Sequence, residues 1–467
     1  MPALPLSLEG ATAADAGLIA RKVRFRRALS LLAMTLVAPG SAQLVAGSRR
    51  LGLIALRLFA LSLLGTVVLA TMALFWRGEL ITVFTSLTWL RVLRFVLVAV
   101  AVGWALLIID AWRIADPLGL GQRQRLTVAV LNGITCFGLT GALLFASHLV
   151  AVQRDFIQSV FGSGAASSAA HGRYNVLLLG GDAGPERVGL RPDSITVASI
   201  DEVTGRTVLL GLPRNLADVP FPGNTVMHAQ FPNGFHCDGC YLNGVNTWAT
   251  DHADLFGRSK DPGIEATTQA VEQITGLTIS YFALVDLKGF QDLVDAVGGV
   301  TVKVAERIPI GGVGGPISGW IEAGRQHLDG YQTLWYARSR ATSDDYSRMA
   351  RQKCVMNAML QQLDPRRVVT NFGDIAQAGK QVISTSIPAS ELDTFVKLAL
   401  KARTLPLSTV SFVPPKIDTG NPDWALIRSM VADALAASES KDAGTPSSPH
   451  KKRHHGANSS SDLADSC

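Results

Sequence analysis

Cysteine is scarce in this sequence, with five residues among 467. The motif "HCDGC" (236–240) is accompanied by no second Cys-x-x-Cys pair and no spaced pair of histidines, so the usual ligand set of a structural zinc ion is missing. An oxidising compartment would favour a short disulfide between Cys237 and Cys240. The alternatives are a zinc site that adds His236 or His252, or two free thiols.

The pattern of a cleavable signal peptide is also missing, because such a peptide has one short apolar run and several long ones follow one another here. Residues 58–76, 95–112 and 126–152 are each about long enough to cross a hydrocarbon core, which takes roughly 20 apolar residues. An earlier run, 29–47, is interrupted by "APGSAQ" and is interpreted as a re-entrant or interfacial hairpin. The sequence therefore predicts an all-α transmembrane region that stays in the lipid bilayer.

The positive charge of the chain is explained better by a membrane than by nucleic acid. Although the net charge is +6, many of the basic residues flank the apolar runs, where they set orientation, so no nucleic-acid partner is expected. They precede the first span and separate the second from the third: 21–27, Arg49, Arg50, Arg113, Arg123 and Arg125. With these clusters in the cytoplasm and three spans, the chain after Val152 is expected on the outer face of the cell membrane. A full crossing by 29–47 would instead place it inside.

Composition divides the chain into five parts. They are a basic cytoplasmic N-terminus (1–28), the membrane region (29–155), a small-residue linker (156–173), a globular domain (174–436) and a tail (437–467). The tail has too few apolar residues to offset the entropy of ordering, so it is predicted to be disordered.

Strand-like and helix-like segments alternate within the globular part. "NVLLLG" (175–180) is typical of a buried strand, and residues 194–211 of a β-hairpin with its turn at Thr204 and Gly205. Apolar spacing predicts helices at 264–274, 289–297 and 346–363, and "GGV" (298–300) is expected to end the middle helix and begin another strand. This alternation predicts an α/β fold, an extracytoplasmic α-β-α sandwich with a central mixed sheet.

Charged residues recur where strands end and helices begin. "GGD" (180–182), "RPD" (191–193), "LPRN" (212–215) and "YARSRATSDDYSRMARQ" (336–352) all carry Asp or Arg at such places, and rigid scaffolds carry sites on loops there. If Asp182 and Asp193 meet, they offer the oxygen ligands that Mg²⁺ prefers alongside phosphate groups. Arginine presents a fixed fork of donors for phosphate, so these segments predict a phosphoryl-transfer site. A solvated helix face with ion pairs is the simpler alternative for 336–352.

The order of these segments, together with "LVDLKGFQDLVDAVGGVTV" and "GRQHLDGYQTLWYARSR", resembles the LytR-CpsA-Psr family of bacterial cell-envelope proteins over about residues 174–365. No single motif is specific, but the six in this order are. The resemblance implies a membrane-anchored, Mg²⁺-assisted phosphotransferase that moves a glycopolymer from a polyprenyl diphosphate carrier onto peptidoglycan.

The resemblance also implies roles for individual residues. Asp182 and Asp193 match the metal-associated aspartates, and either is a candidate to help deprotonate the attacking sugar hydroxyl. The pyrophosphate-binding arginines match Arg191, Arg214, Arg338, Arg340 and Arg348, of which Arg191, Arg338 and Arg340 are assigned with the aspartates to catalysis. Arg351 and Gln352 match the closing Arg-Gln pair, and Asn243 matches a frequent Asn that could equally be structural.

Two positions depart from the family pattern. Asn215 stands where Asp is typical, and Gly211 where Ser is usual. If the carboxylate normally holds an arginine, the neutral amide would hold it less strongly. A non-catalytic binder of polyprenyl phosphate or wall polymer is therefore an alternative function. A polyprenyl-pyrophosphate hydrolase is a second alternative, because water can replace the sugar hydroxyl in the same site.

Overall fold

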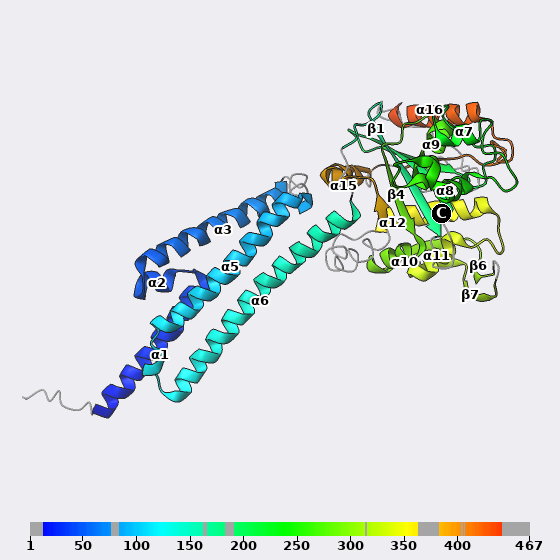
Figure 1. Ribbon diagram of the computed structural model, residues 1–467. Coiled ribbons are helices and arrows are strands. Elements are labelled where there is room, and N and C mark those ends of the chain that lie inside the picture. The colour runs from blue at the N-terminus through cyan, green and yellow to red at the C-terminus, as the bar shows by residue number, and fades with distance from the viewer. Residues whose placement is uncertain are drawn as a thin grey trace, which may run out of the picture. The chain divides into compact units, whose positions relative to one another are not determined.

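The computed structural model describes residues 13–75, 84–161, 166–182, 191–312, 315–362, 383–402, 405 and 407–440. The chain divides into two compact units, Met1–Arg154 and Asp155–Cys467. Each is described by itself (Figure 1).

The described elements of the first unit are all helices. Its helices are α1 (Ala13–Val37), α2 (Ser41–Ala46), α3 (Arg49–Phe75), α5 (Leu87–Ile114), η1 (Pro117–Gly119) and α6 (Gln122–Val160), which continues into the second unit. Three segments are long and apolar enough to cross a membrane, Arg49–Met72, Leu87–Ile114 and Gln122–Val160. The second and third contain the predicted runs 95–112 and 126–152, and the first covers the predicted run 58–76 up to Met72. Helix α6 continues beyond its run into the segment expected to be a linker.

The interrupted run 29–47 forms the end of α1, a break and the short helix α2. Gly40 lies in the break with φ of 94°, and a Cβ there would come within 2.6 Å of the Gly52 carbonyl oxygen, so glycine is required. The Gln43 side chain is satisfied in part: Nε2 donates to the Leu107 carbonyl oxygen at 2.9 Å, whereas Oε1 is buried without a hydrogen-bond partner among the described residues.

The second unit is built around a mixed sheet, which confirms the predicted α/β class. Its described strands have the order β10-β3-β2-β1-β4-β9. They are β1 (Arg173–Asp182), β2 (Arg191–Asp201), β3 (Thr207–Leu212), β4 (Tyr281–Asp286), β9 (Ile383–Thr385) and β10 (Ser408–Ser411). The pairs β1–β2, β2–β3 and β4–β9 are antiparallel, whereas β1–β4 and β3–β10 are parallel. The β2–β3 pair is the predicted hairpin, since the Gly205 N–H donates to the Asp201 carbonyl oxygen.

Alternation along the strands separates two apolar faces. Leu177, Val197 and Leu210 belong to the main core, which is completed by α8 (Leu242–Asp251), α9 (Pro262–Thr275) and α16 (Trp424–Ser440). On the opposite face, Ala198 and Leu209 form a smaller cluster with Met356 of α12 (Asp345–Gln362). Figure 1 shows β1 and β4 with α8, α9 and α16 in this unit. α16 continues to Ser440, so a helix begins the segment predicted as a disordered tail, and 441–467 lie outside the described residues.

A second core lies away from the central sheet. It is formed by α10 (Leu287–Ala296), β5 (Val300–Val304), β6 (Ile308–Gly311), β7 (Ile317–Ile321), β8 (Gly324–Leu328), α11 (Gly330–Arg338) and α12. The expected strand after "GGV" is β5, but it pairs with β8 rather than with the central sheet. The remaining short elements are α7 (Val226–Gln230), η2 (Ala253–Phe256), η3 (Ala389–Glu391) and α15 (Leu392–Ala402).

Candidate active site

A β-bulge displays Asp193 at the end of the central hairpin. The β1–β2 register pairs Gly180 with Ser194 and then Gly181 with Pro192, so Asp193 is the extra residue on β2. An unpaired bulge residue can aim its side chain away from the regular alternation, and bulges recur beside active sites. The side chain of Asp193 is about one-third exposed, at 34%.

Arg214 follows β3 and bridges two carboxylates from distant parts of the chain. Its Nη1 lies 2.5 Å from Asp193 Oδ1, and its Nε lies 3.1 Å from Asp345 Oδ1. The side chain is 21% exposed. Because Asp193 lies on β2 and Asp345 begins α12, this one guanidinium connects the sheet edge to the helix.

Asp345 gathers three arginines. Besides Arg214, it contacts Arg348 Nη2 at 3.1 Å and Arg340 Nη1 at 3.7 Å. Arg348 also donates from Nη2 to the Asp193 backbone carbonyl oxygen at 2.8 Å. Arg214, Arg340 and Arg348 thus converge around Asp193 and Asp345, and their charges leave this group with a net positive charge.

The electrostatics of the group favour ionised side chains. Burial alone would raise the pKa of Asp193, but the hydrogen bond from Arg214 and the charges of Arg214, Arg348 and Arg340 outweigh it and lower that pKa. Burial would lower the pKa of Arg214, whereas its hydrogen bond and charge pairing with Asp193 and Asp345 raise it. Arg348 is buried, which lowers its pKa, yet a guanidinium remains charged.

Arg351 and Gln352 hold the chain that carries the other arginines. Arg351 is buried and donates from Nε to the Tyr336 carbonyl oxygen at 2.7 Å, from Nη2 to the Ser339 carbonyl oxygen, and to Ser343 Oγ at 3.2 Å. Gln352 Nε2 donates to the Ala337 carbonyl oxygen at 3.3 Å. Both side chains therefore fix the end of α11, which carries Arg338, and the turn before α12, which carries Arg340.

The other predicted site residues are placed by contacts of their own. Arg338 lies with Cζ 5.0 Å from the centroid of the Trp335 ring. Asp182 ends β1 opposite the exposed Arg191 in the strand register, while the Asp182 side chain lies outside the described atoms. Asn243 donates its backbone N–H to the Arg214 carbonyl oxygen at 3.0 Å.

Asn215 does not hold an arginine. Its Nδ2 donates to Thr419 Oγ1 at 3.2 Å, and the Tyr346 hydroxyl lies 3.0 Å from the same oxygen. The Asn215 Oδ1 atom is buried without a hydrogen-bond partner among the described residues. The neutral residue at this position therefore faces a small polar network.

Sequence reasoning missed Asp345 as the centre of the arginine group. An aspartate at the start of a helix usually acts through a cap or the helix dipole, and its neighbour Asp344 does so, with Oδ1 accepting from the Ser347 N–H at 2.7 Å. The available signal was the Asp345–Arg348 spacing, which places the two side chains on one helix face.

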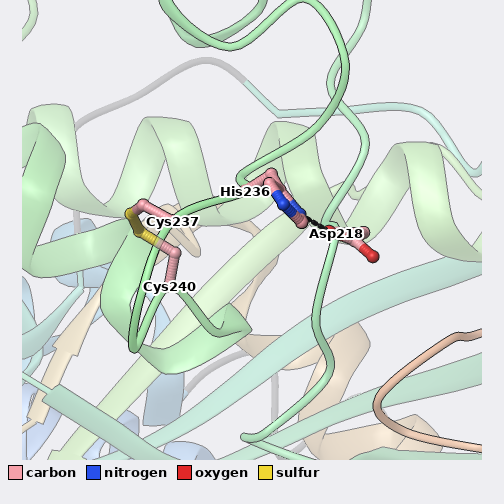
Figure 2. The surroundings of a disulfide bond; sticks show 4 residues. All are labelled: Asp218, His236, Cys237 and Cys240. Atoms are coloured by element: carbon pink, nitrogen blue, oxygen red, sulfur yellow. Dashed lines mark hydrogen bonds and ion pairs between the residues drawn. A yellow bond between two sulfur atoms is a disulfide. The ribbon is translucent and has the colours of Figure 1, made fainter.

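The "HCDGC" loop forms a disulfide between Cys237 and Cys240. Of the histidines proposed as alternative zinc ligands, His236 bonds to Asp218 through Nδ1, as Figure 2 shows. The ring of His252 stacks on Trp248 at 4.1 Å between centroids. Within the described residues no group of three or more His, Cys, Asp or Glu could hold a metal ion.

An α/β domain whose sheet edge gathers guanidinium groups has the chemistry of a site for phosphate groups. The sequence pattern of the LytR_cpsA_psr family matches residues 150–421, more than half of the chain, so this protein belongs to the LytR-CpsA-Psr family.

Three relatives illustrate the match. The chain is 28% identical over 225 residues to the polyisoprenyl-teichoic acid–peptidoglycan teichoic acid transferase TagU of Oceanobacillus iheyensis, across 48% of this chain and 61% of that protein. It is 27% identical over 266 residues to the cell wall biosynthesis protein LcpA of Corynebacterium glutamicum, across 52% and 50%. It is 34% identical over 187 residues to the probable cell wall biosynthesis protein LcpB of the same organism, across 39% and 36%.

The chain therefore spans less than two-thirds of the length of these curated relatives. Among solved structures, the crystal structure of B. subtilis TagV is 22% identical, with 57% of this chain and 96% of that chain covered and a TM-score of 0.42.

Proposed function

We propose that this protein is a membrane-anchored phosphotransferase that moves a glycopolymer from a polyprenyl diphosphate carrier onto peptidoglycan during bacterial cell-wall assembly. The observation that carries the proposal is the convergence of Arg214, Arg340 and Arg348 around two carboxylates. Family membership and the TagU relative, whose name states this kind of transfer, support it.

The reaction needs little more than positioning and charge stabilisation. An acceptor hydroxyl of peptidoglycan attacks the phosphorus atom that bears the glycopolymer, and the bond to the bridging oxygen breaks. Polyprenyl phosphate leaves, and the hydroxyl proton passes to a base. The arginine group offers donors for the phosphate oxygens, with Arg340 the most exposed of its three members at 32%. Paired with Arg214, Asp193 has a lowered pKa and is a weak base, so proton removal by Asp193 requires that pairing to loosen.

Magnesium is part of the proposal. Asp182 ends β1 and Asp193 lies near the beginning of the neighbouring antiparallel strand β2, and carboxylates suit Mg²⁺, which binds one or two of them together with phosphate oxygens. When bound, the ion would neutralise phosphate charge.

The membrane topology is also part of the proposal. The three candidate spans and the basic clusters support a multi-pass anchor with residues after Val152 on the outer face, and the α-β-α layering is retained as the finer description of the fold. A reporter enzyme that works only outside the cytoplasm should be active when it is fused after residue 200. If a reporter that works only in the cytoplasm is active there instead, transfer to peptidoglycan is excluded.

The decisive experiment incubates the full chain in detergent micelles with a polyprenyl diphosphate-linked saccharide, a peptidoglycan acceptor and Mg²⁺. Saccharide covalently attached to peptidoglycan is the expected product. Arg348→Lys should abolish it, because the terminal Nη2 makes the contacts to both Asp345 and the Asp193 carbonyl oxygen, and the shorter lysine side chain does not reach that position. Arg325→Lys is the matched control, since Arg325 is exposed on β8.

The products separate transfer from the alternatives. Free saccharide phosphate with no attached polymer would indicate the hydrolase. Tight lipid binding with neither product would indicate a non-catalytic binding protein and reject the proposal.

A further inference from the structure

The Cys237–Cys240 disulfide closes a small loop on the surface of the second unit. Its two cysteines are three positions apart in sequence. Cys237 is exposed, whereas Cys240 is half-buried and packs against the main core. The two sulfur atoms therefore differ in access to a solution reagent.

This loop is tied on both sides to the segment that carries Arg214. Before the disulfide, the Phe235 N–H donates to the Val219 carbonyl oxygen at 2.9 Å, and His236 bonds to Asp218. Figure 2 shows that His236–Asp218 contact beside the disulfide. After the disulfide, two further ties are made: the Leu242 N–H donates to the Leu216 carbonyl oxygen at 2.9 Å and the Asn243 N–H to the Arg214 carbonyl oxygen at 3.0 Å.

Backbone with positive φ occurs both in this segment, at Asp218, and in the disulfide loop that contacts it, at Gly234. Asp218 has φ of 51°, in the left-handed region that an L side chain rarely adopts. Gly234 has φ of 93°, and a Cβ there would lie 2.8 Å from the Asp218 carbonyl oxygen. Such conformations persist where the surrounding structure over-determines them, and the cross-linked loop is part of that surrounding structure.

We propose that Cys237 and Cys240 form a thiol–disulfide exchange site for an external dithiol, and that the state of this disulfide sets the order of the segment bearing Arg214. The ligand class is a reduced dithiol, either a small molecule or a protein with a Cys-x-x-Cys pair. This inference concerns redox chemistry and does not depend on the transfer reaction.

One thiolate of the dithiol attacks the exposed Cys237 Sγ, the bond between the two Sγ atoms breaks, and Cys240 leaves as a thiolate that takes up a proton. The second thiolate of the dithiol then attacks the dithiol sulfur that is bonded to Cys237. Cys237 leaves as a thiolate and also takes up a proton. The reagent is oxidised to its disulfide, and the protein receives two electrons and two protons.

The position of Cys240 suits a leaving thiolate. It directly precedes Tyr241, the N-cap of the ten-residue helix α8. The partial positive charge at a helix N-terminus stabilises a nearby thiolate and so favours its departure.

The test uses the full chain in detergent micelles, equilibrated with mixtures of reduced and oxidised dithiothreitol. Alkylation followed by peptide mass spectrometry measures opening of Cys237–Cys240, with the free Cys136 as the labelling reference. Hydrogen exchange measures the Leu242 and Asn243 amides, whose acceptors lie on the Arg214 segment. Opening should speed their exchange by about tenfold or more while amides of the buried strand β1 stay unchanged.

Two variants separate the effect of the disulfide from that of the His236–Asp218 contact. Cys237→Ser/Cys240→Ser should show the fast exchange in oxidising buffer and no response to dithiothreitol. His236→Ala removes one tie and keeps the disulfide, so it should still respond. The proposal is overturned if the disulfide of the wild-type protein opens only when the whole domain unfolds, or if it opens with the two amides unchanged; both results are obtained without the variants.

Discussion

Lys353 is a buried amine on the face of α12 that meets the central sheet. It lies one turn after Met349, whose Cε is 3.4 Å from where a Cβ on Gly211 would be, and one turn before Met356, which packs against Ala198 and Leu209. The residue is 7% exposed, and its Nζ has no hydrogen-bond partner among the described residues. Burial lowers its pKa from the ordinary 10.5 to about 8.

This depressed pKa measures a cost to stability. One pKa unit corresponds to about 1.4 kcal/mol, so keeping Lys353 protonated at neutral pH costs about 3 kcal/mol of the free energy of unfolding. Methionine has a similar length and no charge to bury. Lys353→Met should therefore raise the free energy of unfolding at neutral pH by up to about 3 kcal/mol.

The pH dependence distinguishes charge from packing. The cost is fully present below the folded pKa of about 8 and declines as pH rises from there to the unfolded value of 10.5, because Lys353 is then neutral in both states. The advantage of Lys353→Met should shrink over that range. Urea unfolding of the fragment Asp155–Cys467, followed by tryptophan fluorescence, measures it, with the exposed Lys416→Met as control. An unchanged or reduced stability at neutral pH would refute the reasoning, as would an advantage that does not vary with pH.

Three further predictions concern the arginine group and Arg351, which supports it. Asp345→Asn should lower the transfer rate by about tenfold or more, equivalent to about 1.4 kcal/mol, because three guanidinium groups lose their shared carboxylate. The control Asp344→Asn keeps the helix cap and should leave the transfer rate unchanged. Arg351→Met should lower the free energy of unfolding by about 3 kcal/mol in urea titrations, since the carbonyl oxygens of Tyr336 and Ser339 lose their donor; an unaffected midpoint would contradict this. Because the pKa of Asp193 is lowered in the folded protein, its ionised form contributes stability above the unfolded pKa of about 4, and this stability is lost as pH falls through the folded pKa. As pH falls, the midpoint of thermal unfolding should therefore decline less for Asp193→Asn than for the wild-type protein.

The local elements of the fold could be predicted because their signals are local. Alternation with a glycine turn predicts the β2–β3 hairpin, and the stripe Phe290, Leu293, Val294 predicts the helix observed as α10. The partner of β5 could not be predicted in this way. Any strand with an alternating pattern can join any available edge, and only packing against α12 and α11 places β5 beside β8 rather than in the central sheet.

The candidate site could be predicted as a set of residue types and only partly as a set of roles. Arg348 and Arg351 are three positions apart on one helix and read alike in sequence. In the structure Arg348 reaches the carboxylate of Asp345 and the backbone of Asp193, while Arg351 turns to the carbonyl oxygens of the preceding turn. Distance along the chain does not reveal which guanidinium finds a carboxylate and which finds backbone.

The same limit applies to Asn215, whose missing charge suggested a weakened site. The carboxylates that hold Arg214 come instead from Asp193 and Asp345, one on each side of the guanidinium. Since a guanidinium fork paired with two carboxylates is already fixed in orientation, a further negative charge at position 215 is not needed for Arg214. Asn215 instead bonds Thr419, which also contacts the Tyr346 hydroxyl at the start of α12. Position 215 therefore joins the segment after β3 to the helix that carries Arg348, and the described contacts hold the arginine group together without it.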